Sequence, residues 1–487
     1  RAAGDAGDAD YDLLVIGTGG AGTAAAIRAA ELGVRSAIVE GADVVGGTCI
    51  NVGCIPSKYL IEAAHHYHTA RSTFPGISAC TPELAWREVQ RGKQAVVDEL
   101  REAKYVAVLK AYESITLLHG RAVLEPAAAA ASAASDGAVR VRVDQQLVRA
   151  RRVVIATGTA PAMPPIPGLA EVGALDSTSV MELEALPASL LVIGGGSIGL
   201  ELGQTFARFG VRVVVLEREE RILPTEDPDV SAALAAALTA EGMEIQTGVR
   251  VTGAKRMADG VALTVERGSL RGEVQAERVL VATGRRPNTA DLGLEAAGVR
   301  TDPRGFIPTD EFMRTSHPAV YAAGDVTGGP GFVYVAALQG GIAAQAALAD
   351  QTGEAPIPID LTATPRVTFT DPQVAAVGRT EAETRAAGYD PKVTTLPVAA
   401  LSRAAVSYQR AGLIKLVADT ASDRLLGAHL VSANAGDVIG EAALALKFTL
   451  TAQNLVSTLH PYLTWGEGLK LAAQTFTKDV ALLSCCA

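Results

Sequence analysis

The chain has 487 residues, which is too long for a single hydrophobic core and predicts about three domains. Its content of 48% hydrophobic and 20% charged residues is typical of a globular protein, and its net charge of −10 argues against nucleic-acid binding, which needs cationic surface. The chain contains no run of about 18 apolar residues, so no membrane span is expected. Its start has no basic stretch followed by an apolar one, so nothing indicates secretion and a cytoplasmic location is expected.

Residues 1–10 are small and acidic and are expected to form a flexible linker. An apolar strand follows and ends in G-x-G-x-x-G at Gly17, Gly19 and Gly22. After a small-residue helix (23–32) and a second strand (36–39), Glu40 stands at the spacing expected for a carboxylate on a ribose hydroxyl. We call this order of strand, glycine-rich turn, helix, second strand and acidic residue a frame. It predicts a dinucleotide site, because the glycines let backbone N–H groups approach a pyrophosphate.

The stretch 46–58 places Cys49 and Cys54 five residues apart. Gly53 and Pro56 imply an irregular loop before a helix, with Pro56 in the first turn of that helix. In such a loop the two Cα atoms can come within roughly 4.4–6.8 Å, the range that a disulfide needs. A helix N-terminus stabilises an anion, so a reactive thiolate is expected at Cys54. A pair of buried structural cysteines is the alternative.

The first frame recurs later in the chain. A second apolar strand ends in G-x-G-x-x-G at Gly194, Gly196 and Gly199, and the strand 211–216 ends at Glu217. Two such frames predict two bound nucleotides.

Each frame is followed by an apolar strand that ends in Ala-Thr-Gly, at Gly158 and at Gly284, and Asp325 later closes a similar strand. This order predicts that the second nucleotide domain is inserted in the first. The expected boundaries are 11–158 with 285–356 for the split domain, and 159–284 for the inserted one.

Beyond Pro356 we expect antiparallel strands over 367–370, 413–417 and 425–431, with a helix over 435–449 packed on them. This region, 357–487, carries no nucleotide signature and is predicted to be an α+β dimerisation domain. The predicted fold is thus α/β, with two Rossmann-like domains, one inside the other, and a C-terminal α+β domain.

A nicotinamide gives up a hydride and thiols take electrons in pairs, while a flavin can do both. Two nucleotides and a cysteine pair therefore predict FAD in the first site and NAD(P)H in the second. Here the chain resembles the FAD-dependent pyridine nucleotide–disulfide oxidoreductases, whose GGTCxNxGCxPSK motif matches residues 46–58. The resemblance covers essentially residues 11–480.

The resemblance implies that Cys54 faces the flavin, that Cys49 exchanges with substrate, and that Lys58 and Glu201 form an ion pair beside the flavin. For FAD it implies contacts from Gly17, Gly19, Gly22, Glu40, Thr48, Gly158 and Asp325. For the nicotinamide nucleotide it implies Gly194, Gly196, Gly199, Glu217, Arg218 and Gly284. Glu217 favours NADH, whereas Arg218 and Arg221 favour NADPH, which that family uses more often.

Disulfide reductases of this family carry a His-Pro pair whose histidine is oriented by a glutamate five residues after it. Here His460 precedes Pro461, but Trp465 takes the position of the glutamate. His460 is therefore expected to lack its orienting acid, which disfavours disulfide reduction.

The chain ends with the adjacent pair Cys485 and Cys486, a soft ligand pair for a thiophilic metal. With residues 460–464 and 469–476, this tail is similar to that of the mercuric reductases within the family. The resemblance implies a homodimer in which the tail of one subunit passes Hg(II) to the redox cysteines of the other. The implied metal ligands are Cys49, Cys54, Cys485 and Cys486, and the implied flanking tyrosines are Tyr105 and Tyr462.

Many mercuric reductases also carry an N-terminal metal-binding domain, and the linker-like start leads us to expect that it was absent or removed. Two alternatives remain open: a dihydrolipoamide- or glutathione-type disulfide reductase, and a protein that sequesters mercury through its thiols without turnover.

Overall fold

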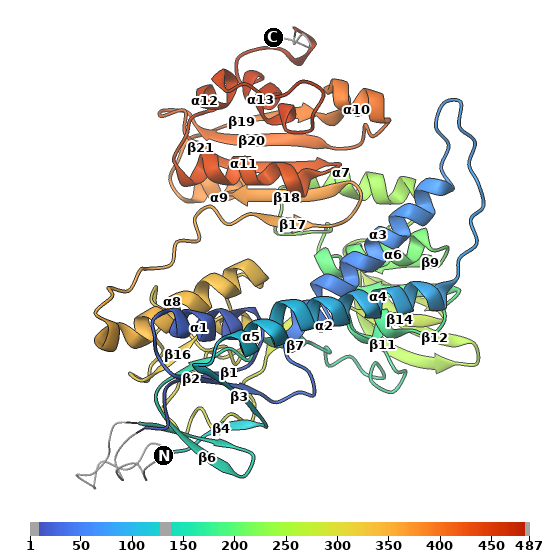
Figure 1. Ribbon diagram of the computed structural model, residues 1–487. Helices are drawn as coiled ribbons and strands as arrows, with labels where there is room; N and C mark the ends of the chain where they lie inside the picture. Colours follow the sequence, from blue (N-terminus) through green and yellow to red (C-terminus); the bar gives the residue numbers. More distant parts are fainter. Residues whose placement is uncertain (1–8, 127–137, 483–487) are drawn as a thin grey trace. The chain divides into compact units, whose positions relative to one another are not determined.

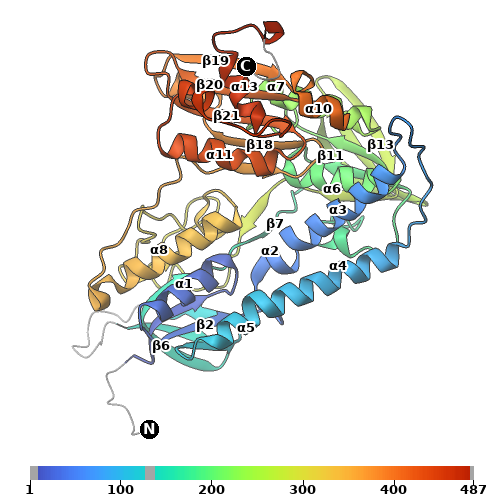
Figure 2. The same ribbon diagram turned by 45° about the horizontal axis from the view of Figure 1, so that its top comes forward.

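The computed structural model describes residues 9–126 and 138–482 (Figures 1 and 2). Residues 1–8 of the expected linker and the Cys485–Cys486 pair lie outside these residues. The chain divides into two compact units. The first gathers the described parts of Arg1–Ser57, Gln90–Ala162 and Gly284–Asp360, and the second those of Lys58–Val89, Met163–Thr283 and Leu361–Ala487.

The first unit is built on a seven-stranded sheet in the order β3-β2-β1-β6-β5-β4, with β16 also paired to β6. The parallel strands are β1 (Tyr11–Ile16), β2 (Ser36–Glu40), β3 (Ile115–His119), β6 (Gln146–Ile155) and β16 (Val320–Ala322). Strands β4 (Ala122–Leu124) and β5 (Val139–Val143) continue it antiparallel, and β7 (Thr159–Pro161) pairs with β15 (Arg285–Pro287). Because β1, β6 and β16 are parallel neighbours, their carboxyl ends meet at one edge, where open α/β sheets bind ligands.

Two helices, α1 (Gly20–Glu31) and α8 (Val333–Thr352), run side by side over this sheet (Figure 1), and their alanines share a core with β1 and β6. Helix α1 begins three residues before the predicted start at residue 23. The remaining helices before β3 are α2 (Gly47–Asn51), α3 (Cys54–Ala70), α4 (Trp86–Arg101), a π-helical turn (Glu102–Val106) and α5 (Ala107–Ala111). Most of α3 and the start of α4 belong to the second unit.

The second unit holds a four-stranded parallel sheet in the order β10-β9-β8-β14. Its strands are β8 (Ser189–Ile193), β9 (Arg212–Leu216), β10 (Glu244–Gln246) and β14 (Arg278–Val281), and its helices are α6 (Ser197–Arg208) and α7 (Pro228–Ala240). An antiparallel sheet of β11 (Arg250–Met257), β12 (Gly260–Arg267) and β13 (Leu270–Ala276) packs beside it.

The C-terminal part of the second unit is a five-stranded antiparallel sheet in the order β17-β18-β21-β20-β19. Its strands are β17 (Arg366–Thr368), β18 (Gln373–Gly378), β19 (Pro391–Pro397), β20 (Leu413–Asp419) and β21 (Leu425–Ser432). The helices are α9 (Glu381–Ala386), α10 (Ser402–Ser407), α11 (Ala435–Lys447), α12 (Ala452–Ser457) and α13 (Glu467–Gln474). The predicted fold class is confirmed, although β18 and β19 were not predicted. Across residues 9–126 and 138–482, no helix combines the length and the apolar character that a membrane crossing requires.

Candidate active site

The two glycine-rich turns have the same geometry. Gly17 and Gly194 have φ of +105° and +109°, and a Cβ at either would lie 2.5 Å from the carbonyl oxygen of the Ala-Thr-Gly alanine that follows in the same sheet. A Cβ at Gly22 or Gly199 would lie 1.8 Å or 2.1 Å from the carbonyl oxygen of the first glycine of its own turn. Only glycine fits these positions, and the result is a bare backbone at the N-terminus of α1 and of α6, suited to a pyrophosphate.

The two predicted ribose acids are also equivalent. The Glu40 carboxylate accepts a hydrogen bond from the Thr18 hydroxyl and another, at 2.8 Å, from the N–H of Ala42. Glu217 accepts the N–H of Gly195 at 2.6 Å and that of Glu219 at 2.8 Å. Each carboxylate is thus held beside its glycine-rich turn, where a ribose would lie. The spacing argument found both residues.

The cysteine stretch lies against the first turn. The left-handed Gly47 (φ +65°) starts helix α2, and a Cβ on it would be 2.6 Å from the Cα of Gly19. Thr18, which sequence reasoning missed, accepts the N–H of Gly46 at 2.8 Å through its hydroxyl oxygen. Asn51 closes α2 by donating to the carbonyls of Val45 and Gly47 at 2.9 and 3.0 Å.

Cys49 lies within α2, whereas the sequence predicted an irregular loop there. Cys54 is the first residue of α3, as predicted, with Pro56 in its first turn. Tyr105 lies close to both cysteines: burial raises the pKa of its phenol, and negative charge on Cys49 and Cys54 raises it further. The structure therefore brings together the first glycine-rich turn, both cysteines and Tyr105.

Asp325 follows β16, and the Thr159 hydroxyl links its carboxylate to Arg285 on β15. Its carboxylate accepts the Thr159 hydroxyl at 3.0 Å, and that hydroxyl accepts Nε of Arg285 at 2.7 Å. The side chain of Arg285 also donates to the Thr159 carbonyl at 2.7 Å. Thr159 and Arg285 were not predicted, because only the pairing of β7 with β15 brings them together.

Lys58 and Glu201 meet in the second unit, as the resemblance implied. Lys58 Nζ lies 2.7 Å from Glu201 Oε2 and 4.4 Å from the ring centroid of Phe369. The other oxygen of Glu201 accepts the Phe369 N–H at 2.9 Å. Glu201 is buried in α6, so its charge is satisfied by one ammonium and one backbone donor.

The expectation that His460 lacks an orienting carboxylate is wrong. Its Nε2 lies 2.6 Å from Oε1 of Glu441, which projects from α11, and its Nδ1 lies 3.0 Å from the Thr458 carbonyl oxygen. Both ring nitrogens of His460 therefore face an acceptor oxygen. Trp465, at the position of the family glutamate, is buried in the C-terminal core.

Other predicted residues lie apart from these contacts. Tyr462 is half exposed in the loop after His460, and Arg218 is an exposed side chain that pairs with Glu219 at 2.8 Å. Arg221 donates to the Pro224 carbonyl at 2.9 Å. Thr48 is an exposed residue of α2. Gly158 and Gly284 are both left-handed, with φ of +65° and +134°.

Comparison with known proteins agrees with this geometry. A model of the pyridine nucleotide-disulphide oxidoreductases matches residues 11–340, and the dimerisation domain of the same family matches residues 364–473. The chain belongs to the pyridine nucleotide-disulphide oxidoreductases. Its cofactors are accordingly FAD and NADPH, and the match at 364–473 indicates a dimer.

Individual relatives cover nearly the whole chain. A mercuric reductase from Staphylococcus aureus is 44% identical over 99% of this chain and 85% of its own length. One from Streptomyces lividans is 43% identical over 98% of each. Among solved structures, the Cu(II) complex of the HOCl-induced flavoprotein disulfide reductase RclA from Escherichia coli is 30% identical, with a TM-score of 0.82 over 96% of this chain and 99% of that one.

Proposed function

We propose that this protein is a mercuric reductase, which reduces Hg(II) to Hg(0) with NADPH. The observation that carries the proposal is the packing of α2, with Cys49, onto the first glycine-rich turn at Gly47 and Gly19. The identity of over 40% to mercuric reductases along nearly the full chain supports the metal as substrate.

The backbone fits the two cofactors. Both glycine-rich turns have no room for a Cβ atom at their first and last glycines, which leaves the backbone bare. Each turn lies beside a carboxylate that backbone N–H groups orient. Gly17, Gly19, Gly22, Glu40, Thr48, Gly158 and Asp325 would hold FAD, and Gly194, Gly196, Gly199, Glu217, Arg218 and Gly284 would hold NADPH. Bound FAD takes two electrons from NADPH and supplies them in pairs.

The residues of the chain then act in order. Two electrons open a Cys49–Cys54 disulfide, and the resulting dithiolate exchanges with the thiolates that carry Hg(II). Cys485 and Cys486 of the partner subunit deliver the metal, and Tyr105 and Tyr462 would flank it. Two further electrons reduce the dithiolate-bound Hg(II) to Hg(0), and both thiolates are released. Lys58, paired with Glu201, would stabilise the negative charge that develops on the flavin when it is reduced.

The test is Hg(II)-dependent NADPH oxidation in excess thiol, with volatile mercury trapped and counted. We expect wild type to release Hg(0), and a Cys485→Ala/Cys486→Ala double variant to lose most of that release under competing thiol. The Cys80→Ala variant is the matched control, because it removes an exposed thiol that the proposal does not use.

One observation favours a second candidate, a disulfide reductase: His460 does have a carboxylate partner, Glu441, suited to general acid–base work. Glutathione disulfide and lipoamide are therefore assayed in parallel. Turnover of these disulfides without mercury release would replace the first proposal, and mercury binding without NADPH oxidation would leave sequestration.

A further inference from the structure

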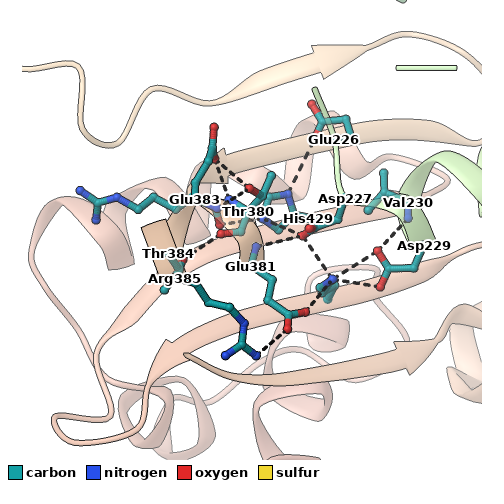
Figure 3. Close-up of polar contacts among 12 residues, drawn as sticks. Glu226, Asp227, Asp229, Val230, Thr380, Glu381, Glu383, Thr384, Arg385 and His429 are labelled. Atoms are coloured by element: carbon teal, nitrogen blue, oxygen red, sulfur yellow. Dashed lines mark hydrogen bonds and ion pairs between the residues drawn. The ribbon is translucent and has the colours of Figure 1, made fainter. Parts of the chain in front are cut away.

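The segment after Glu217, which leads from β9 into α7, is tied to the C-terminal sheet through buried charges (Figure 3). Glu226 and Asp227 are only 6% and 3% exposed. Their carboxylates approach basic side chains on three strands of that sheet: Arg366 on β17, Lys415 on β20 and His429 on β21. We call these five residues the clamp.

The contacts of the clamp are short and mutual. Arg366 donates to both oxygens of Glu226, at 2.6 and 2.9 Å, and His429 Nδ1 lies 3.6 Å from Glu226 Oε2. Lys415 Nζ lies 3.2 Å from Asp227 Oδ2. Figure 3 shows the ring of His429 between the two acids. Asp229 and Glu381 add carboxylate oxygens 3.2 and 3.6 Å from Lys415 Nζ.

The charged forms of Glu226 and Lys415 are favoured. Burial alone would raise the pKa of Glu226, but the neighbouring His429 ring and the hydrogen bonds and charge of Arg366 lower it to about 2. Burial likewise opposes the charge on Lys415, but Asp227 and Asp229 outweigh it and raise the pKa of that ammonium. Removing either partner of such a buried pair leaves a charge without compensation.

A strained residue lies between the clamp and the second glycine-rich turn. Leu223 is buried and has φ of +43°, a left-handed conformation that a leucine rarely adopts. Its N–H donates to the carbonyl of Gly195 at 2.9 Å, and its own carbonyl accepts the N–H of Glu226 at 2.9 Å. Leu223 therefore connects the clamp directly to the middle residue of the turn, whose N–H binds Glu217.

We propose that the clamp holds Leu223 in its left-handed conformation and thereby sets the shape of the second glycine-rich turn for NADPH. A strained backbone persists only where its surroundings over-determine it, and the clamp supplies those constraints on the carboxyl side of Leu223. Lys415 and Arg366 are thus positioning residues for the nucleotide, although they belong to the dimerisation domain. The inference rests on the proposed function only in assigning this turn to NADPH.

The test begins with Lys415→Met, which keeps the length of the side chain and removes its charge. We expect the KM for NADPH to rise about fivefold or more with kcat changed little, because the turn binds the nucleotide and does no chemistry. Equilibrium binding of NADP⁺ should weaken by the same factor, and this measurement needs no mercury. Lys392→Met, which breaks the Lys392–Asp423 pair elsewhere in the same sheet, should leave both unchanged.

A second pair of variants separates strain from loss of packing. Leu223→Gly and Leu223→Ala both remove the side chain, but only glycine accepts the left-handed conformation without cost. In the Lys415→Met background, Leu223→Gly should restore the KM to within about twofold of its starting value, and Leu223→Ala should not. Should Lys415→Met fail to fold, Glu226→Gln, which keeps the shape of the side chain, serves in its place.

An unchanged KM in Lys415→Met, or equal effects of Leu223→Gly and Leu223→Ala, would overturn the inference. A wild-type protein that binds no NADP⁺ would instead overturn the proposed function, so the two failures are distinguishable.

Discussion

Gly22 and Gly199 hold equivalent positions in the two turns, so the same substitution should disable a different cofactor at each. An alanine Cβ at Gly22 would lie 1.8 Å from the Gly17 carbonyl oxygen, and we expect Gly22→Ala to lose FAD on gel filtration, as measured by flavin absorbance. Gly199→Ala should keep its flavin and raise the KM for NADPH at least about tenfold. Gly341→Ala in α8 is the control, because its Cβ would meet no described atom within 4 Å. Retention of FAD by Gly22→Ala would contradict the assignment of the first turn.

At this scale the sequence predicted residues that act through local spacing and missed those that act through distant contacts. Glu40 and Glu217 follow their glycines at a fixed interval along one strand–helix–strand unit. Glu441 reaches His460 across 19 positions, and Lys415 reaches Asp227 across far more. The spacing of residues along the sequence does not indicate such pairs, because each pair depends on how separate elements pack.

Among the elements, helix α3 is anchored far from Cys54 by a charged group around His65. His65 Nδ1 lies 3.3 Å from Asp371 Oδ2, and Arg208 donates to the same carboxylate at 2.8 Å. The hydrogen bond with Asp371 raises the pKa of His65 above its ordinary 6.5. Burial would raise the pKa of Asp371, but the hydrogen bond from His65 and the charge of Arg208 lower it to about 2.

The sign of the pH dependence follows from the raised pKa of His65. Its contribution to stability is complete below pH 6.5 and is lost as the pH rises through the raised pKa. We therefore expect the Tm difference between wild type and His65→Gln to be larger near about pH 5.5 than near about pH 8.5. The exposed His66, on the same helix and paired with Glu62, is the control: His66→Gln should change the pH dependence little. A Tm difference that grows with pH would contradict this account.

Some of the elements that sequence reasoning missed are short or lack alternation. Helix α2 has one turn, too few residues for a 3.6-residue period to register, so an irregular loop was predicted. Strands β18 and β19 were not separated from their surroundings, because β18 is mostly buried and β19 is bounded by prolines. The strand–helix–strand elements around the two glycine-rich turns, whose strands are uninterrupted apolar runs, were predicted to within a few residues.

For the whole molecule, a dimer requires a contact face, and we expect an apolar one on the C-terminal part. Phe448 is 68% exposed and Leu459 92% exposed, and the contact of His460 with Glu441 brings the segment of Leu459 to the helix that precedes Phe448. The match to a dimerisation domain over 364–473 indicates a dimer, and these exposed apolar side chains lead us to predict that a second copy covers this face.

We expect Phe448→Glu to shift the protein toward monomer in light scattering and to abolish mercury release, because the proposed function takes the delivering tail from the other subunit. Reduction of the bound flavin by NADPH, which needs one chain, should persist. Leu270→Glu, an exposed apolar position on β13, is the control and should remain dimeric. A monomeric Phe448→Glu that still releases mercury would rule out a site shared between subunits.

The near-identity of the two glycine-rich turns has a consequence for engineering. Both turns present the same backbone, with a left-handed first glycine and a glutamate carboxylate beside it. The turn itself therefore does not distinguish FAD from NADPH. The two turns differ in what contacts them: the cysteine helix α2 in one case and the strained Leu223 in the other. One nucleotide site can therefore be redesigned through these contacts, and through the residues beside each carboxylate, while the turns themselves are kept unchanged.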